Sequence, residues 1–406
     1  MFGSQCINRE IRYNLPPMDK ILDEQTRPLR LCFFGTYRAN YVRNQVIIAG
    51  LRQNGAIVEE CHSPLWHSVA DRVAQAGGGW KSPRFFKRVI KAYWRLFQAH
   101  RHTPEYDIML VGYPGQFDVY LGRLLSWWRR KPMALDILMS LHLIAEERGL
   151  AQKSPISGKL IFWLEKGSLK LPDLLIADTP EYREYYCEKY DLKPEKFSLV
   201  PLGVDDRIYR PRPDLRPPQD YFRIIYYGTF IPLHGVETMI RAAAALQDQP
   251  QIQFDFYGDG QERPSAEQLA RELNLDNVHF RGWIDKEELP AQIAQSHVVL
   301  GVFGTTKQSR CTIQNKIWEG MMMQRPVISG DAETIQAELK HKKHVYLVER
   351  ANPQALAAGI LELAQTPDLR RQMAIAAFER VQENTIAAIG AKTKELLSVW
   401  QNEKQI

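Results

Sequence analysis

The sequence predicts an α/β protein made of two doubly wound domains that face a central cleft. Three observations carry this prediction. The chain has 406 residues, too many for one ordinary domain. Short apolar runs alternate with helical patterns in both halves, and a proline-rich segment lies between the halves. Two domains of similar size, each with a parallel sheet between layers of helices, explain all three features.

The first half contains short apolar runs without polar alternation, which is typical of strands buried on both faces of a parallel sheet. We expect strands at residues 29–36, 56–61, 106–112, 132–138, 173–178 and 197–203. The segment "YRPRPDLRPP" (209–218) then carries four prolines in ten residues. Neither a helix interior nor a central strand accommodates this pattern, so we interpret the segment as an inter-domain linker.

The second half repeats the alternation. Its predicted strands are residues 222–229, 252–260, 278–284, 297–304, 326–331 and 344–349. The segment 234–247 repeats apolar residues at helical spacing, and the tail from Pro353 to about Glu403 is rich in Ala and Leu, so both are predicted to be helical. The predicted division is an N-terminal extension (1–28), an N-terminal domain (29–208), a linker (209–220), a C-terminal domain (221–385) and a C-terminal helix (386–406) that packs back on the N-terminal domain.

Composition narrows the classes of protein. The 53 Lys and Arg against 47 Asp and Glu are too nearly balanced to indicate a nucleic-acid partner. The five cysteines form no CxxC pair, which favours free thiols in a reducing compartment and no structural zinc. The first 20 residues lack the apolar core of a signal peptide, and no run reaches the roughly 18 apolar residues that span a bilayer. We expect a cytoplasmic protein, either soluble or attached peripherally to the inner membrane face.

Glycines follow several predicted strands, at the edge where parallel sheets bind ligands. They are Gly35 in "FFGTYRANYVRN", Gly228 and Gly235 in "YYGTFIPLHGVE", and Gly258 in "YGDGQE". A glycine there lets a ligand approach the backbone, and the N–H groups of a following helix attract an anion. No GxGxxG opens a helix and no GxxxxGK[ST] is present, so dinucleotide and P-loop sites lose their main support.

The segment "CTIQNKIWEG" (311–320) places polar residues at the start of a predicted helix that begins near Thr312 or Ile313. Asn315, Lys316 and Glu319 share one face of that helix. With Lys307 and Arg310 just upstream, the helix N-terminus is a candidate site for a diphosphate, and Glu319 for sugar hydroxyls. The alternative is a solvated helix face with a Lys–Glu pair.

Several segments taken in order resemble the nucleotide-sugar-binding domain of family 4 (group 1) glycosyltransferases, retaining enzymes of the two-domain GT-B architecture. They are "YGTFIPLHGVETMIRAA", "FDFYGDG", "NVHFRGWIDKEELPAQIAQSHVVLGVFG", "NKIWEGMMMQRPVISGD" and "NPQALAAGILELAQTPDLRRQM". The resemblance extends back through "ADTPEYREYYCEKYDLKPEKFSLVPLGVDDRIYRP" and, more faintly, "FGTYRANYVRNQVIIAGLRQNGAIVEEC". It covers most of the chain and implies the GT-B fold.

The resemblance also implies roles for residues. Glu319 matches the second glutamate of the family's paired-glutamate motif, which holds the ribose of the donor nucleotide. The remaining donor-binding residues that it implies are Gly35 and Thr36 in the first domain, Gly228, Thr229, His234 and Gly258 at strand ends, Gly282, Trp283 and Ile284 along the base, and Arg310, Thr312, Ile313, Gln314, Asn315 and Lys316 around the diphosphate.

The sequence departs from the family pattern at three positions. Cys311 stands where the family has the first glutamate of the pair. Thr229 replaces the usual arginine after the phosphate-loop glycine, and His234 replaces the usual lysine five residues further on. His234 can still donate a hydrogen bond to phosphate. Our hypothesis is that Lys316, Arg310 or Lys307 supplies the missing charge.

The implied reaction moves a sugar from a nucleoside diphosphate to an acceptor hydroxyl. Its main demand is stabilisation of negative charge on the leaving phosphate, which helix amides and cations can meet. The family generally works without a bound metal, and we expect no cofactor or metal here. The first domain commonly contributes a polar residue after its fourth strand. Asp136 is the catalytic candidate together with Glu319, and Ser140 and His142 are the alternatives.

A basic amphipathic segment lies in the first half. Between Arg72 and Pro104 there are eight Lys or Arg and no acidic residue. On a helical wheel the cations of "SPRFFKRVIKAYWRLF" (82–97) fall within about a 100° arc, opposite Phe85, Phe86, Val89, Ile90, Tyr93, Leu96 and Phe97. These cations are Arg84, Lys87, Arg88, Lys91 and Arg95. The helix suits an anionic membrane surface. The alternative is an ordinary domain helix with a solvated basic face.

The leading hypothesis is therefore a retaining glycosyltransferase that acts on a nucleotide-sugar and a saccharide or lipid-linked acceptor, in lipid-linked saccharide or surface polysaccharide synthesis. Two other classes share the architecture. A nucleotide-sugar epimerase of GT-B form needs acid and base residues near the sugar. A non-catalytic GT-B protein that binds a membrane or a partner is favoured by Cys311.

Overall fold

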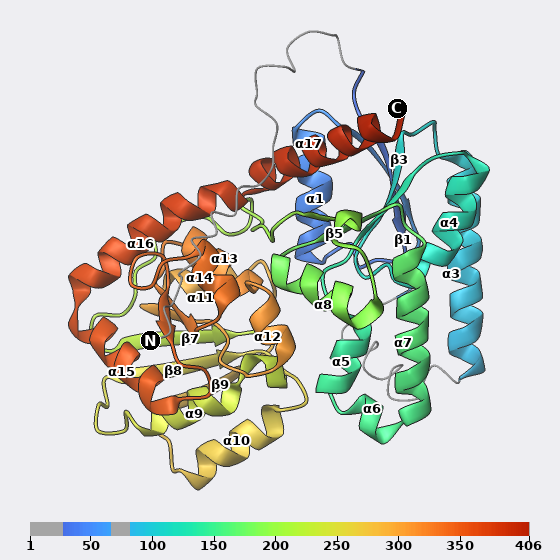
Figure 1. Ribbon diagram of the computed structural model, residues 1–406. Coiled ribbons are helices and arrows are strands. Elements are labelled where there is room, and N and C mark those ends of the chain that lie inside the picture. Colours follow the sequence, from blue (N-terminus) through green and yellow to red (C-terminus); the bar gives the residue numbers. More distant parts are fainter. Residues whose placement is uncertain (1–26, 66–81, 406) are drawn as a thin grey trace, which may run out of the picture.

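The computed structural model describes residues 27–65 and 82–405, which form two α/β domains side by side (Figure 1). Each domain contains a six-stranded sheet, and every strand pair within the sheets is parallel. The strand orders are β2-β1-β3-β4-β5-β6 and β12-β11-β10-β7-β8-β9. Each of the twelve predicted runs forms one strand, so the predicted fold class is confirmed. Parallel order reflects the helix that returns the chain after nearly every strand.

The N-terminal domain begins with β1 and ends with β6. Its elements are β1 (Arg30–Gly35), α1 (Val42–Gln53), β2 (Ile57–His62), α3 (Pro83–His102), β3 (Ile108–Val111), α4 (Asp118–Trp128), β4 (Met133–Asp136), α5 (Leu141–Glu147), α6 (Leu150–Lys153), α7 (Pro155–Lys170), β5 (Leu174–Ala177), α8 (Pro180–Tyr190) and β6 (Phe197–Leu199).

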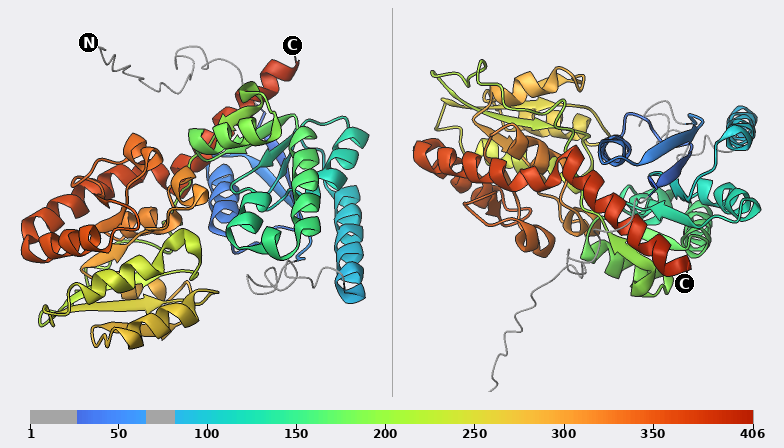
Figure 2. Two further views of the ribbon diagram at one scale, coloured as in Figure 1. Left: turned by 60° about the horizontal axis from the view of Figure 1, so that its bottom comes forward. Right: turned by 90° about the horizontal axis from the view of Figure 1, so that it is seen from above.

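Successive side chains of a strand point to opposite faces of the sheet, so the core of this domain has two layers. Cys32 and Phe34 of β1 point toward α3, α4, α7 and α8, whereas Leu31 and Phe33 point toward α1 and α17. Consequently α3, α4 and α7 cover one face of the sheet together (Figures 1 and 2). Their opposite sides face away from the sheet.

The C-terminal domain follows the proline-rich segment, which contains no helix or strand. Its elements are β7 (Phe222–Tyr227), α9 (Val236–Ala244), β8 (Ile252–Tyr257), α10 (Arg263–Glu272), β9 (Val278–Gly282), α11 (Leu289–Ala294), β10 (Val298–Leu300), α12 (Lys307–Cys311), α13 (Asn315–Met322), β11 (Val327–Gly330), α14 (Glu333–Glu338), β12 (Tyr346–Val348), α15 (Pro353–Gln365) and α16 (Pro367–Val381).

The last helix, α17 (Ile386–Gln405), leaves the C-terminal domain and lies on α1 of the N-terminal domain (Figure 1). The two helices cross where Gly390 meets Gly50. A Cβ atom on Gly390 would lie 2.0 Å from the carbonyl carbon of Gly50, so the crossing requires glycine. Ile386, Ile389 and Leu397 complete the apolar layer on this face of the sheet.

One apolar cluster joins the domains. Tyr113, Leu138 and Leu202 of the N-terminal domain belong to the same buried cluster as Ile313 and Trp318. The described residues include no helix that is both long enough and apolar enough to cross a bilayer.

Candidate functional site

The strand-end glycines of the C-terminal sheet gather at one edge. Gly228 and Gly258 follow β7 and β8, Gly282 is the last residue of β9, and all three have positive φ. A Cβ atom on Gly258 would lie 1.9 Å from the carbonyl oxygen of Gly228, so these turns pack backbone against backbone. Glycine is required there because a side chain would separate the two turns.

The helix that carries the polar residues begins later than expected. A start near Thr312 or Ile313 is wrong, because Thr312 and Gln314 have extended backbone conformations and α13 begins at Asn315. Thr312, Ile313 and Gln314 instead form a short connection after α12. Lys307 and Arg310 lie on α12 and are exposed.

Lys316 lies almost fully buried against the Gly228 turn. Its Nζ would be 3.2 Å from a Cβ atom on Gly228, and it lies 4.3 Å from the centre of the Tyr226 ring. Among the described residues, Nζ finds no hydrogen-bond partner. Burial lowers the pKa of the ammonium to about 7, and the nearby carboxylate of Glu319 only partly opposes this shift. A buried amine without a partner is costly unless a ligand pairs with it.

His234 lies beside Lys316 at the same turn. Its Nδ1 is 2.7 Å from the Tyr226 hydroxyl, and its Cε1 would be 3.2 Å from a Cβ atom on Gly228. Burial, followed by the charge of Lys316, lowers the pKa of the imidazole well below its usual value. His234 is therefore neutral at pH 7, and it adds a polar group but no charge. Thr229, the other departure from the family pattern, accepts a hydrogen bond from Tyr226 through its backbone oxygen.

Glu319 lies one turn further along α13 and is also buried. Burial raises the pKa of its carboxyl, and the hydroxyls of Tyr227 and Tyr209 lie within hydrogen-bonding reach of it. Lys286 lies near enough to favour the charged form. No sequence motif pointed to Tyr209 or Lys286. They meet Glu319 only because the linker and the segment after β9 converge on α13.

Unpaired polar atoms concentrate in this region. Among the described residues, five buried side-chain atoms without a hydrogen-bond partner belong to residues 308–318. They are Gln308 Nε2, Gln314 Oε1, Asn315 Oδ1, Lys316 Nζ and Trp318 Nε1. Buried polar atoms are normally paired, so such a concentration indicates a site where a ligand or water completes the hydrogen bonds.

Cys311 packs into the apolar core of the N-terminal domain. Its backbone oxygen accepts a hydrogen bond from Thr179 Oγ1, and the next residue, Thr312, donates from Oγ1 to Asp178. Burial raises the pKa of the thiol to about 11. At neutral pH Cys311 is therefore an uncharged apolar contact between the domains, and it does not reproduce the charge of the family's first glutamate.

Arg350 binds backbone oxygens next to the contact that Cys311 makes between the domains. No sequence motif pointed to Arg350. It follows β12 and donates to the carbonyl oxygens of Gly304 (2.9 Å), Ser309 (3.0 Å) and Asp331 (2.7 Å). Burial lowers the pKa of its guanidinium to about 10. These bonds fix the loop that leads from β10 into α12.

The candidates in the N-terminal domain are buried. Asp136 ends β4, and its carboxylate is bonded to Arg43, with Nη2 at 2.7 Å and Nε at 3.0 Å. Thr36 and the Gly35 turn pack against Asp118, whose Oδ2 accepts from the Thr36 amide at 2.7 Å. These bonds give Asp136 and Thr36 structural roles in this conformation. Their contacts with a donor stay predictions.

The predicted base-binding segment follows β9, the edge strand. Trp283 is 71% exposed, whereas Ile284 packs on the apolar cluster that joins the domains. An exposed indole at a strand end is suited to stacking on a base. This role, like that of Gly282, stays a prediction.

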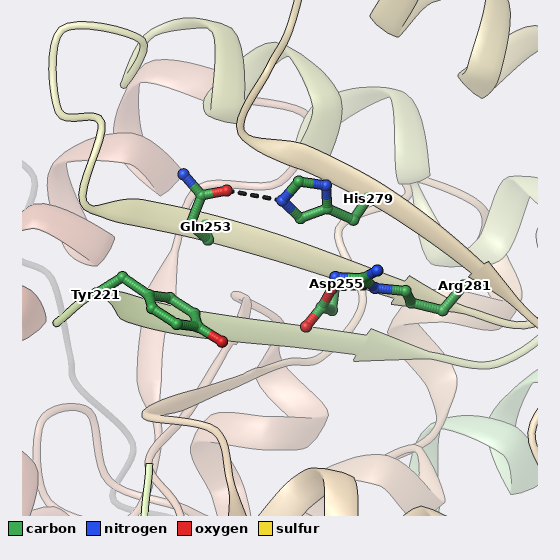
Figure 3. A pocket seen from close by; sticks show the side chains of 5 residues that line it. All are labelled: Tyr221, Gln253, Asp255, His279 and Arg281. Atoms are coloured by element: carbon green, nitrogen blue, oxygen red, sulfur yellow. Dashed lines mark hydrogen bonds and ion pairs between the residues drawn. The ribbon is translucent and has the colours of Figure 1, made fainter. Parts of the chain in front are cut away.

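A pocket of about 300 Å³ lies elsewhere on the C-terminal domain (Figure 3). Tyr221, Gln253, Asp255, His279 and Arg281 line it, on the side of β8 and β9 before the strand-end glycines. Its charges are already paired, because Asp255 binds both Arg223 and Arg281 at 2.6 Å. It is therefore separate from the site around Lys316.

Comparison with known proteins agrees with the fold. Residues 221–366 match the family model described as "Glycosyl transferases group 1". The chain is 23% identical over 316 residues to D-inositol 3-phosphate glycosyltransferase of Streptomyces scabiei, covering 71% of this chain and 70% of the relative. It is 28% identical over 225 residues to the lipopolysaccharide core biosynthesis glycosyltransferase LpsD of Rhizobium meliloti, covering 51% of this chain and 63% of that relative.

Solved structures share the fold. Sucrose-phosphate synthase from Thermosynechococcus elongatus superposes with a TM-score of 0.68 at 20% identity, covering 92% of this chain and 99% of that one. Anabaena Alr3699/HepE in complex with UDP and glucose superposes with a TM-score of 0.66 at 17% identity, covering 91% and 100%. The C-terminal domain thus matches the group 1 glycosyltransferase model, and the two domains together share the GT-B fold of these structures.

Proposed function

We propose that the protein is a retaining glycosyltransferase that takes a nucleoside-diphosphate-sugar as donor and a saccharide or lipid-linked hydroxyl as acceptor. The observation that carries the proposal is the Lys316 ammonium, buried and unpaired at the Gly228 turn. A diphosphate bound there supplies the missing partner. Lys316 thus replaces the cations that Thr229 and His234 do not provide.

The diphosphate lies, in this proposal, between the Gly228 turn and the first turn of α13. The amides at the start of that eight-residue helix point toward it, and the helix dipole favours the negative charge. Arg310 and Lys307 on the neighbouring α12 are exposed and act at longer range. As the sugar leaves, negative charge grows on the phosphate, and a fixed cation in a dry site stabilises it.

Glu319 accepts hydrogen bonds from the ribose hydroxyls. Its buried carboxylate is positioned by Tyr209 and Tyr227, and Lys286 and Lys316 favour its charged form. Because the two tyrosines come from the linker and from β7, the ribose site depends on both segments. Trp283 stacks on the base. We expect no metal, since Lys316 and the helix amides supply the stabilising charge.

The acceptor belongs to lipid-linked saccharide or surface polysaccharide synthesis at the inner membrane face. Support comes from the cations of α3, four of which are exposed on one side of the helix: Arg84, Lys87, Lys91 and Arg95. The relative LpsD is named for lipopolysaccharide core biosynthesis.

Incubation with UDP-, GDP- and ADP-sugars tests the chemistry directly. We expect slow release of nucleotide from one donor class, insensitive to EDTA. With an accepted acceptor, proton NMR of the product reports whether the anomeric configuration is kept. An inverted product contradicts the retaining mechanism, and conversion of the donor sugar without release indicates an epimerase.

A non-catalytic GT-B protein is the second candidate, favoured by the uncharged Cys311. It would bind a nucleoside diphosphate without releasing nucleotide from any donor. The same incubations separate the two candidates, provided that binding is measured in parallel.

A further inference from the structure

The apolar side of α3 is divided between the core and the surface. Ala92 and Leu96 point into the domain, but Phe86, Ile90 and Trp94 are 63%, 54% and 60% exposed. These three residues are spaced four apart and form a stripe along the helix. On the helical wheel the stripe lies directly beside the cations. The exposed side of α3 is therefore apolar along one edge and basic along the other.

The two neighbouring helices continue this surface. Exposed large apolar side chains on α4 and α7 are Leu124, Trp127, Trp128, Ile156, Leu160 and Trp163. Together the three helices hold nine of the fourteen exposed large apolar residues found among the described residues. We refer to the outward sides of α3, α4 and α7 as the three-helix surface.

The three helices lie in one layer, so their outward sides face the same way (Figures 1 and 2). All three pack on the same face of the sheet. Helices α3 and α4 are in contact, and Tyr120 of α4 donates to the backbone oxygen of Leu164 in α7 at 2.6 Å. The exposed apolar side chains thus belong to one continuous layer.

The exposed charges of this surface have a single sign. Helix α3 contains no acidic residue, and the only ones in α4 and α7, Asp118 and Glu165, are buried and bonded within the domain. A cation accompanies one of the indoles, because Lys166 lies 5.5 Å from the Trp163 ring. Arg123, 4.9 Å from the Trp127 ring, is already paired with Asp173.

We propose that the three-helix surface seats the N-terminal domain on an anionic lipid bilayer. Tryptophans prefer the headgroup region, and cations beside them are attracted to anionic lipids. A second copy of the chain fits less well, because a two-fold contact through this surface would bring cations against cations. The inference extends the membrane part of the proposed function and is independent of the donor chemistry.

This orientation brings the membrane close to a contact between the domains. Helix α7 begins at Pro155, shortly after α5, whose last residue, Glu147, accepts a hydrogen bond from the Gln308 amide of α12 at 2.9 Å. The three-helix surface therefore adjoins the segment that meets the C-terminal domain.

Vesicle co-sedimentation of the full chain tests the inference. The vesicles are phosphatidylcholine alone or phosphatidylcholine and phosphatidylglycerol in equal parts. An apolar variant combines Leu124→Ser, Trp128→Ser and Trp163→Ser. A charge variant changes Arg84, Lys87, Arg88, Lys91 and Arg95 to Glu. The control variant, Ile57→Ser with Ile375→Ser, removes exposed apolar residues from other elements.

We expect the wild type and the control to bind anionic vesicles, and both surface variants to bind at least about tenfold more weakly. Circular dichroism confirms that each variant is folded. If the apolar variant binds like the wild type while the charge variant does not, only α3 contacts lipid and the inference is wrong. Absence of wild-type binding overturns the membrane claim as a whole, whatever the nucleotide assays give. A wild-type dimer that the apolar variant abolishes assigns the surface to a second copy.

Discussion

In the proposed function, a single lysine supplies the charge that the sequence lacks at the phosphate loop. The usual cations are replaced by Thr229 and His234, and the imidazole of His234 is neutral. Lys316 approaches the same turn from α13. Its burial lowers its pKa to about 7, which makes its charge sensitive to pH in the physiological range.

Replacement of Lys316 by Met should weaken nucleoside diphosphate binding about 10- to 100-fold, because one buried charged hydrogen bond is lost. Wild-type affinity should fall as the pH rises above 7, by up to about tenfold per unit, because the amine loses the proton that pairs with the phosphate. Titration calorimetry from pH 6 to 9 measures both effects. Lys307→Met is the control, and an equal loss in that variant would move the phosphate site to α12.

Glu319→Ala should lower the affinity for a ribonucleotide to that for its 2′,3′-dideoxy analogue, because the carboxylate then no longer accepts from the ribose hydroxyls. We expect about a tenfold loss for the ribonucleotide and little change for the analogue. Competition binding with the two nucleotides provides the measurement. Equal losses for both would place Glu319 away from the ribose.

The elements were more predictable than the site. All twelve strands overlap predicted runs, and β3, β5 and β10 are wholly apolar and buried, because burial on both faces of a parallel sheet leaves a strong local signal. The start of α13 was placed too early, since the extended backbone at Thr312 is fixed by its bond to Asp178 in the other domain. Tyr209, Lys286 and Arg350 were missed for the same reason: only the tertiary fold brings them to the site.

Helix α3 shows a second limit of sequence patterns. Its periodicity separates apolar from basic residues but does not say which residues face the sheet. The buried side is centred on Ala92, Leu96 and His100, so half of the apolar side remains outside. Which residues of α3 face the sheet depends on how the helix packs against the sheet in the tertiary structure.

At the scale of an element, the crossing of α1 and α17 predicts how a substitution there changes stability. Gly390→Val should lower the free energy of unfolding by about 1–3 kcal/mol, because the new side chain meets the backbone of Gly50. Ala391→Val, on the exposed side of the same helix, should cost much less. Thermal or denaturant unfolding measures both variants. Equal stabilities would show that α17 does not pack on α1 in solution.

At the scale of the whole molecule, the segment 308–312 connects the two domains beside the donor site. Its bonds reach Glu147, Asp178 and Thr179 of the N-terminal domain. Burial raises the pKa of the Asp178 carboxyl to about 7, although Thr312 and Arg43 favour its charged form and Asp136 opposes it. Ionisation of Asp178 therefore destabilises the folded protein.

Because the pKa of Asp178 is higher in the folded protein, protonation of this carboxyl should add to the free energy of unfolding below about pH 4. This contribution should be lost as the pH rises to about 7. Asp178→Asn should remove this dependence, which amounts to a few kcal/mol at most. Melting temperatures across this range, compared with the exposed control Asp248→Asn, measure it. A parallel pH profile in wild type and Asp178→Asn would show that Asp178 is not a titrating contact between the domains.

The most direct test of the central claim is the thermal shift of the wild type and Lys316→Met with UDP, GDP and ADP. A ligand at 100 times its Kd adds about 2.7 kcal/mol of stability. We predict that at least one of the three nucleotides raises the melting temperature of the wild type by several degrees, and that Lys316→Met loses most of that shift. If none of the three shifts the wild type, or if the variant responds equally, Lys316 does not hold the diphosphate of a donor.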